Sequence, residues 1–215
     1  MKAKIILIII VNLMLNVLKK NRYDELERTS SIYLRQEDLP CEFGGKALDV
    51  INDFIQKTHD RDYEVVMYFD YVTGEIIDYA FGEEKGVKID FDDVDFKEKH
   101  IVSIHNHPPT VYSPPSDKNF SILLRSFEDY ELVASVEGLW ILKAIGINPI
   151  LNMDFKFYAE RILEICQEHC DKLYSDPIKA DEVCDRMYGV SLSNYINDKN
   201  INDIQLTKRE YSNDH

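Results

Sequence analysis

Two histidines stand one residue apart in the stretch from Ile101 to Phe120, which reads IVSIHNHPPTVYSPPSDKNF. The short apolar run before them is typical of a β-strand. Side chains at positions i and i+2 of a strand point to the same face, so we expect His105 and His107 to face the same side of a sheet. Two neutral imidazoles on one face offer two ligands to a divalent metal, and zinc takes such nitrogens at about 2.0–2.1 Å.

A proline-rich loop follows the second histidine and leads to Asp117. Four prolines occur in the nine residues 108–116. Because proline fixes φ, such a loop loses little entropy when it holds one shape, and we expect it to return Asp117 toward the histidines as a third ligand. Two histidines and one carboxylate leave a fourth position for water, the layout of a catalytic zinc site. Zinc lowers the pKa of its water from about 15.7 to about 7, and a nearby carboxylate is then the general base.

These residues resemble the JAMM motif of the JAB/MPN metalloproteases, in which a strand-end H-x-H-P is followed about ten residues later by an aspartate near a serine. RadC-like and JAB-like prokaryotic proteins carry HNHP in the same place, as this chain does from His105 to Pro108. The resemblance covers roughly residues 30–145. It implies an α/β (α+β) fold, a mixed β-sheet flanked by helices with the JAB/MPN (cytidine-deaminase-like) core.

The resemblance also implies roles for individual residues. Three of them resemble the zinc (Zn2+) ligands of the family: His105, His107 and Asp117. Glu64, which lies 41 residues before His105, resembles the glutamate that takes the proton of the water. The family places an oxyanion-stabilising serine three residues before the aspartate, where this chain has Pro114. Ser113 and Ser116 flank that proline, and Ser113 is the candidate we prefer.

The activity implied by the resemblance is that of a zinc-dependent hydrolase, a metallopeptidase or isopeptidase of the JAMM type. Zinc-activated water would cleave a peptide, isopeptide or other amide bond in a protein or peptide substrate, ubiquitin-like proteins included. Two alternatives stay open. One is a non-catalytic MPN-like protein-interaction module, and the other is a phage- or mobile-element-associated JAB domain. The fold does not select the substrate, and the oligomeric state is also left open.

The charge of the chain argues against a nucleic-acid partner. The 215 residues carry a formal net charge of -14, whereas nucleic-acid binding usually needs a basic face for phosphate contacts. The tripeptide HNH is not evidence for an HNH nuclease, because that name refers to residues spread over a ββα-metal unit. We therefore expect no nucleic acid among the partners.

The four cysteines indicate a reducing compartment, because they are few and form no regular framework. We therefore expect a cytoplasmic protein. Cys166, His169 and Cys170 lie within five residues and would be a loose zinc site, but the simpler interpretation is a half-buried helix face.

The N-terminal segment is apolar and basic. Residues 5–18 are mostly apolar, fewer than the about 20 that a spanning helix needs, and residues 1–22 hold five basic and no acidic side chains. Three alternatives remain: contact of residues 4–20 with a membrane surface, an extra helix packed on the domain, or an untranslated stretch with Met14 as the start. If the segment is an anchor, its basic residues favour a cytoplasmic body.

Hydrophobic periodicity predicts the elements that position these residues. We expect a strand within 30–40, a helix over 44–59, a hairpin over 63–82 turning at Thr73-Gly74, a strand over 100–104, a helix over 119–127 and a hairpin over 130–145 turning at Glu137-Gly138. A long helix over 153–174 is expected to bury one stripe: Phe155, Tyr158, Ile162, Ile165, His169 and Leu173. A short helix over 180–189 and a frayed polar tail from Ser191 complete the chain, and Trp140 is expected in the core.

The corresponding domain organisation has four parts. Residues 1–27 are the apolar, basic N-terminal segment, residues 28–150 the JAB/MPN-like catalytic domain, residues 151–190 the C-terminal helices and residues 191–215 a polar tail.

Overall fold

The structure is a computed structural model that describes residues 17–82, 100–109, 115, 119, 128–144, 149–177, 179–180, 183–184, 187–188, 191 and 204–213. The backbone alone is described for residues 144, 149–160 and 204.

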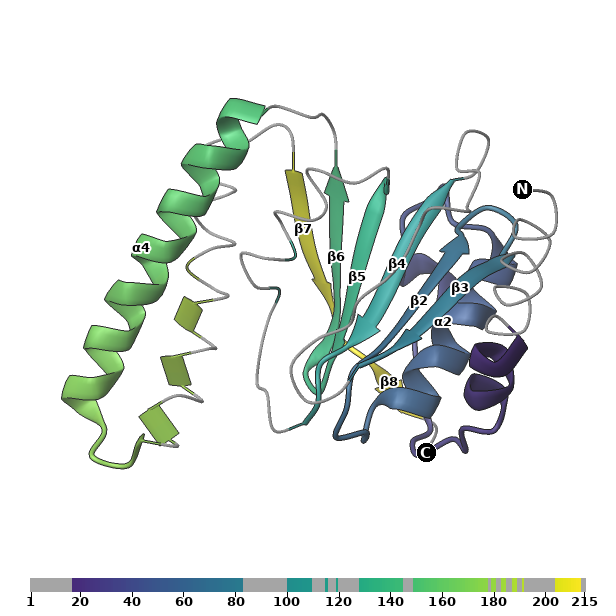
Figure 1. Cartoon of the computed structure of the whole chain (residues 1–215), viewed down its shortest axis with the longest axis horizontal. Coiled ribbons are helices and arrows are strands. Elements are labelled where there is room, and N and C mark those ends of the chain that lie inside the picture. Colours follow the sequence, from purple (N-terminus) through teal and green to yellow (C-terminus); the bar gives the residue numbers. More distant parts are fainter. Residues whose placement is uncertain are drawn as a thin grey trace, which may run out of the picture.

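A six-stranded mixed sheet is the centre of the described fold (Figure 1). Its strands, in spatial order, are β3 (Ile76–Phe81), β2 (Val65–Asp70), β4 (Ile101–Asn106), β5 (Tyr130–Ser135), β6 (Gly138–Ala144) and β7 (Ile204–Arg209). β4 and β5 are parallel, and the other neighbours are antiparallel. A second sheet pairs β1 (Ile32–Tyr33) with β8 (Ser212–Asn213). Among the described residues, helical elements are residues 17–24, η1 (Gln36–Asp38), α2 (Gly45–Thr58) and α4 (Pro149–Leu173), and the described residues 177, 179–180, 183–184, 187–188 and 191 are also helical.

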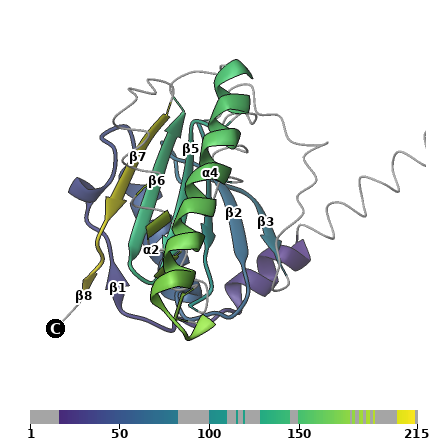
Figure 2. The same ribbon diagram turned by 90° about the vertical axis from the view of Figure 1, so that its left-hand side faces the viewer.

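This arrangement confirms the predicted fold class at the level of a mixed α+β protein. α2 and α4 lie on opposite sides of the sheet, and Figure 2 shows α4 in front of β5 and β6 with α2 behind them. Both predicted hairpins are present, β2 with β3 and β5 with β6. The predicted apolar strand is β4, which lies between β2 and β5 in the middle of the sheet.

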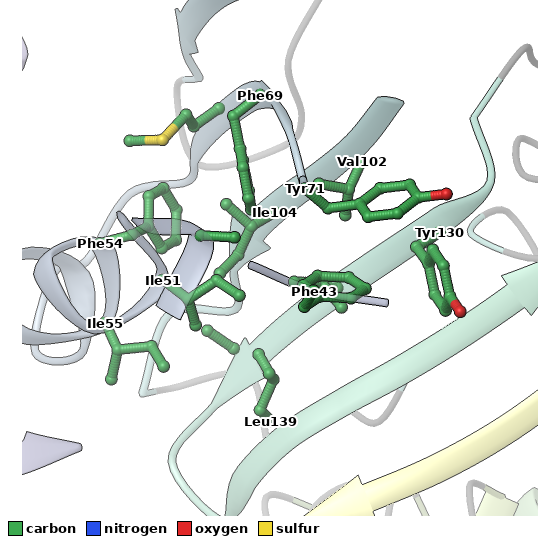
Figure 3. Packing of buried hydrophobic residues seen from close by; sticks show 14 of the residues in the cluster. Phe43, Ile51, Phe54, Ile55, Phe69, Tyr71, Val102, Ile104, Tyr130 and Leu139 are labelled. Atoms are coloured by element: carbon green, nitrogen blue, oxygen red, sulfur yellow. The ribbon is translucent and has the colours of Figure 1, made fainter. Parts of the chain in front are cut away.

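The face of the sheet toward α2 carries the main hydrophobic core (Figure 3). α2 buries Ala47, Ile51, Phe54 and Ile55 at helical spacing. The alternate residues of the strands meet them there: Val65, Met67, Phe69, Val102, Ile104, Tyr130, Leu132, Leu139 and Ile141. Because strand side chains alternate between faces, the intervening residues of β2, β4 and β5 lie on the opposite face of the sheet.

Two glycines permit the turns of the hairpins. Gly74 has a φ of 71°, and a Cβ there would lie 2.8 Å from the Cβ of Lys46. Gly138 has a φ of 145°, and a Cβ there would lie 2.3 Å from the carbonyl oxygen of Arg209 in β7. Positive φ is accessible to glycine at little cost. Because glycine has no Cβ, Gly138 also allows the backbone of Arg209 in β7 to lie close to the start of β6.

The expectation of a frayed tail is wrong for residues 204–213. β7 pairs with β6 along six residues, from Ala144↔Ile204 to Leu139↔Arg209, and β8 pairs with β1. Without β7, the edge of β6 would have unpaired N–H and C=O groups. Hydrogen bonds to these groups stabilise β7, whose sequence is too polar to be recognised as a strand from its hydrophobicity.

Among the four residues of the stripe predicted for the long helix whose side chains are described, Ile162 packs against a hydrophobic cluster, and the prediction is wrong for the other three, Ile165, His169 and Leu173, which are exposed. Ile165 and Leu173 are 53% and 62% exposed. The buried face instead contains Cys166 and Cys170, which join Val133, Trp140 and Leu142 of the sheet in a second hydrophobic cluster with Ala180, Cys184 and Tyr188. The simpler interpretation of these cysteines, a helix face, is confirmed, and so is the expectation that Trp140 fills a core.

The predicted helix over 119–127 lies outside the described residues except for Asn119, which is helical. In the part of the chain that the structure describes, no helix has the length and apolar character needed to cross a membrane. Most of the apolar N-terminal segment lies outside that part.

Candidate metal centre

The two histidines converge at the C-terminal end of β4. His105 is the fifth residue of the strand and pairs with Val66 of β2. His107 follows the strand, and its backbone N–H donates to the carbonyl oxygen of Ala134 in β5 at 2.8 Å. The Nε2 atoms of the two rings lie 3.2 Å apart, and each residue is 7% exposed. The convergence that the i, i+2 spacing predicted is therefore present.

The protonation state of His105 suits a ligand. Burial, and to a lesser degree the neighbouring His107, hold the pKa of His105 well below its usual value of 6.5. His105 is therefore neutral at physiological pH, and a neutral imidazole has a lone pair to give to a metal.

The separation of the two nitrogens fits a shared zinc ion. Two nitrogens that each lie about 2.0–2.1 Å from one tetrahedral zinc are about 3.3 Å apart, close to the 3.2 Å between the Nε2 atoms of His105 and His107. The donor chemistry and the spacing of these two residues therefore fit the metal that the motif implies.

Asn119 and Glu131 join this pair, and neither residue was selected from the sequence. The side-chain N–H of Asn119 donates to Oε1 of Glu131 at 2.8 Å, and the same nitrogen lies 3.2 Å from Nε2 of His105. Glu131 is a residue of β5 that is 3% exposed, and its Oε1 lies 3.6 Å from Nδ1 of His105. The amide and the carboxylate thus border His105 on its two ring nitrogens.

A buried polar row crosses the sheet beside this group. Tyr68, Ser103 and Glu131 are direct cross-strand neighbours in β2, β4 and β5. Ser103 donates its hydroxyl hydrogen to Glu128, which is 4% exposed. Burial, followed by the charge of Glu128, raises the pKa of Glu131 well above its usual range, and the hydrogen bond from Asn119 opposes this shift. A charged residue in the apolar run YELVAS was the signal that could have drawn attention to Glu131.

The residue between the histidines points to the other face and fixes the site to the core. The side-chain oxygen of Asn106 accepts a hydrogen bond from the backbone N–H of Val65 at 2.7 Å. Its side-chain nitrogen donates to the carbonyl oxygens of Thr58 and Tyr63 at 3.3 and 3.0 Å. Asn106 is fully buried, so these three bonds connect β4 with the end of α2 and the start of β2.

Glu64 lies immediately before β2 and is half-buried. Its carbonyl oxygen accepts a hydrogen bond from the N–H of Gly82 at 2.8 Å. Val66, two residues further along, pairs with His105. Strand alternation therefore assigns the Glu64 position to the same face of the sheet as His105.

Two of the residues implied by the resemblance, Ser113 and Asp117, lie outside the described residues, as do Pro114 and Ser116. Among the residues that are described, no three His, Cys, Asp or Glu side chains are grouped closely enough to hold a metal ion. His100 is exposed and His59 half-buried, and neither belongs to this group.

Comparison of the chain with models of known protein families finds no match. Comparisons with curated proteins and with solved structures likewise find none.

Proposed function

We propose that this protein is a zinc-dependent hydrolase of the JAMM type, with the JAB/MPN core, that cleaves a peptide, isopeptide or other amide bond. The observation that carries the proposal is the pair of buried Nε2 atoms of His105 and His107, 3.2 Å apart at the end of a central strand. Their spacing equals that of two ligands on one tetrahedral metal, about 3.3 Å, and burial keeps His105 neutral.

His105 and His107 would hold the ion, with Asp117 as the third ligand that the motif implies. Zinc bound by these residues would lower the pKa of a coordinated water to about 7 and polarise the carbonyl group of the substrate. Every other part of the reaction falls to side chains of the protein.

Glu64 is the proposed general base. Its position two residues before Val66, the partner of His105, assigns it to the face that carries the histidines. The hydrogen bond from Gly82 to its carbonyl oxygen and the bond from Val65 to Asn106 fix the backbone on both sides of its side chain. A carboxylate fixed in this way would accept the proton of the attacking water and return it to the leaving amine.

Ser113 is the serine we propose for stabilisation of the oxyanion, in place of the family serine where this chain has Pro114. A hydroxyl hydrogen directed at the negative oxygen of the tetrahedral intermediate would lower the barrier for attack. The substrate class is a protein or peptide, with ubiquitin-like proteins among those to screen.

A reducing, cytoplasmic location is part of the same proposal. All four cysteines are free, and Cys166, Cys170 and Cys184 are buried. Unpaired thiols are usual where disulfides do not persist.

Elemental analysis of untagged protein is the experiment that tests the proposal. We expect about one zinc per chain in the parent protein and none in the His105→Ala/His107→Ala double variant, followed by zinc-dependent cleavage of peptide or ubiquitin-like substrates. If neither protein takes up zinc when it is offered, the hydrolase proposal is wrong and a non-catalytic MPN-like interaction module becomes the better interpretation.

A further inference from the structure

The amide of Asn119 lies against the ring nitrogen of His105 that is proposed to bind the metal, and the proposed reaction gives this amide no role. Its nitrogen lies 3.2 Å from Nε2 of His105, and Nε2 of His107 lies at the same distance from that atom. Asn119 is 8% exposed, and the two histidines are 7% exposed each. Three buried side chains therefore meet at a nitrogen that a metal ion would need.

This contact uses the lone pair that a metal would use. The side-chain nitrogen of Asn119 is a donor only, so in its contact with His105 the amide donates and Nε2 accepts. A neutral imidazole has one accepting nitrogen, and the lone pair of that nitrogen points in a single direction in the plane of the ring. The amide hydrogen and a zinc ion, which would lie about 2.0–2.1 Å from the nitrogen, therefore compete for the same lone pair.

A second hydrogen bond holds the amide in this place. The nitrogen of Asn119 also donates to Oε1 of Glu131 at 2.8 Å, and Glu131 is 3% exposed in β5, the strand next to β4. The amide thus lies between two buried acceptors on neighbouring strands and donates to both. A buried acceptor without a donor is costly, so the metal-free protein is more stable with the amide between them.

We propose that the amide of Asn119 caps Nε2 of His105 in the metal-free protein, and that a metal ion binds the histidine pair only by displacing this amide. Asn119 thereby sets the metal affinity of the site, because the hydrogen bond to His105 is broken when the ion binds. The consequence for catalysis rests on the proposed hydrolase function. The cap itself is a property of the metal-free protein and is testable without zinc.

The first experiment measures the zinc affinity of the full-length protein by competition with a chromophoric chelator. Asn119→Ala has no amide to displace, so it should bind zinc more tightly than the parent by the value of a hydrogen bond, about 2–10-fold. Asn119→Leu fills the place of the amide with an apolar side chain of similar size and should show no such gain. Asn52→Ala, which removes an amide on α2 at the other face of the sheet, is the matched control and should equal the parent.

The second experiment observes the cap directly by NMR of isotopically labelled protein at neutral pH. Long-range proton–nitrogen spectra of the metal-free protein report whether Nε2 of His105 accepts a hydrogen bond, and a His105→Gln variant assigns the signal. We expect this signal to shift in Asn119→Ala toward that of an imidazole nitrogen without a donor. In the parent, zinc should also move the side-chain N–H signals of Asn119, because the amide leaves the ring.

The outcomes separate the two proposals. Weaker zinc binding by Asn119→Ala overturns the cap and indicates that the amide oxygen is a ligand, and an affinity or an Nε2 signal equal to that of the parent also overturns the cap. If Asn119→Ala does not fold, the parent decides, because Asn119 signals that stay in place while zinc binds overturn the cap. If neither protein binds zinc, the hydrolase function is wrong, and the Nε2 signal of His105 alone decides whether the cap is present.

Discussion

The Nε2 atoms of His105 and His107 lie 3.2 Å apart, and both residues are 7% exposed. Two buried nitrogens at this separation are either hydrogen-bonded to each other or share a cation, and neutral rings serve both arrangements. The parallel pairing of β4 with β5 places a buried carboxyl group, that of Glu131, within 3.6 Å of the first ring.

His107→Ala should abolish stoichiometric zinc binding and hydrolysis while leaving the domain folded. The side chain lies at the end of β4, outside the hydrophobic core on α2, and the backbone N–H that anchors it to Ala134 remains in the variant. Elemental analysis, together with circular dichroism and a melting curve, checks both parts. A variant that unfolds would indicate a structural metal instead of a catalytic one. His100→Ala, which alters an exposed histidine, is the control and should keep its zinc.

Glu64→Gln should keep the metal and lose turnover. The amide is the same size as the carboxylate but does not accept a proton at neutral pH, so the rate should fall by about 10²–10⁴-fold, with zinc content unchanged. Single-turnover cleavage and elemental analysis of the same sample measure the two quantities. Asp62→Asn, an exposed change two residues earlier, serves as the control. Full activity in Glu64→Gln would show that another group is the base.

Asn119→Asp should couple the stability of the protein to zinc. The new carboxylate would lie beside Oε1 of Glu131, where the amide now donates at 2.8 Å, and near Nε2 of His105. Loss of the amide donor to Glu131 should lower the melting temperature when a chelator is present. Excess zinc should restore it, since a ligand at 100 times its Kd stabilises the folded state by about 2.7 kcal/mol.

Asn119→Leu is the control for that variant. It should also melt early in the presence of chelator, because Glu131 loses its donor, but zinc should not rescue it. Equal zinc affinities for the parent and Asn119→Asp, measured by chelator competition, would show that position 119 does not reach the metal.

Asn106→Leu should lower the free energy of unfolding by about 3 kcal/mol, because it removes three hydrogen bonds to backbone groups, and a buried group left unsatisfied costs about 1–3 kcal/mol before relaxation. Those bonds go to the N–H of Val65, to the carbonyl oxygen of Thr58, which keeps the N–H of Arg61 as a donor, and to the partly buried carbonyl oxygen of Tyr63. Urea unfolding measures the difference. Asn52→Leu is a matched control, since the side chain of Asn52 on α2 makes hydrogen bonds only with the partly buried backbone of Leu34. This variant should lower the free energy of unfolding by about 1 kcal/mol. A near-neutral Asn106→Leu would contradict this role.

Asp70 should make the stability of the fold depend on pH in the acid range. Burial tends to raise its pKa, but hydrogen bonds from the backbone N–H groups of Thr73, His100 and Val72 outweigh this, and the pKa is lowered in the folded state. A group with a lowered folded pKa stabilises the protein above its unfolded pKa, about 3.9 for aspartate. That contribution is lost as the pH falls through the folded pKa.

The parent should therefore exceed Asp70→Asn in free energy of unfolding by about 2 kcal/mol at neutral pH, the scale of hydrogen bonds to a charged acceptor. The difference should shrink as the pH falls below about 4. Unfolding curves at several pH values check this. Asp62→Asn, at an exposed position, should show no such trend, and a difference that is constant down to acid pH would rule out the titration of Asp70 as its cause.

The local elements were predictable because their signals lie within a few neighbouring residues. The short apolar runs of β2 and β4, the helical spacing of Ala47, Ile51 and Phe54, and the glycine turn at Gly74 each depend on short-range features of the sequence. The convergence of His105 and His107 belongs to the same class, since strand alternation alone places side chains i and i+2 on one face.

The tertiary structure alone decided which distant residues join His105 and His107. Glu131 reaches His105 because β5 pairs in parallel with β4, and Asn119 contacts both although it follows the loop. The polar strand β7 forms part of the sheet because the edge of β6 satisfies its backbone, and α4 buries Cys166 and Cys170 in place of the larger Ile165 and Leu173. Such pairings depend on contacts between segments far apart in the chain, and a local pattern of residue types does not encode which segment becomes the neighbour.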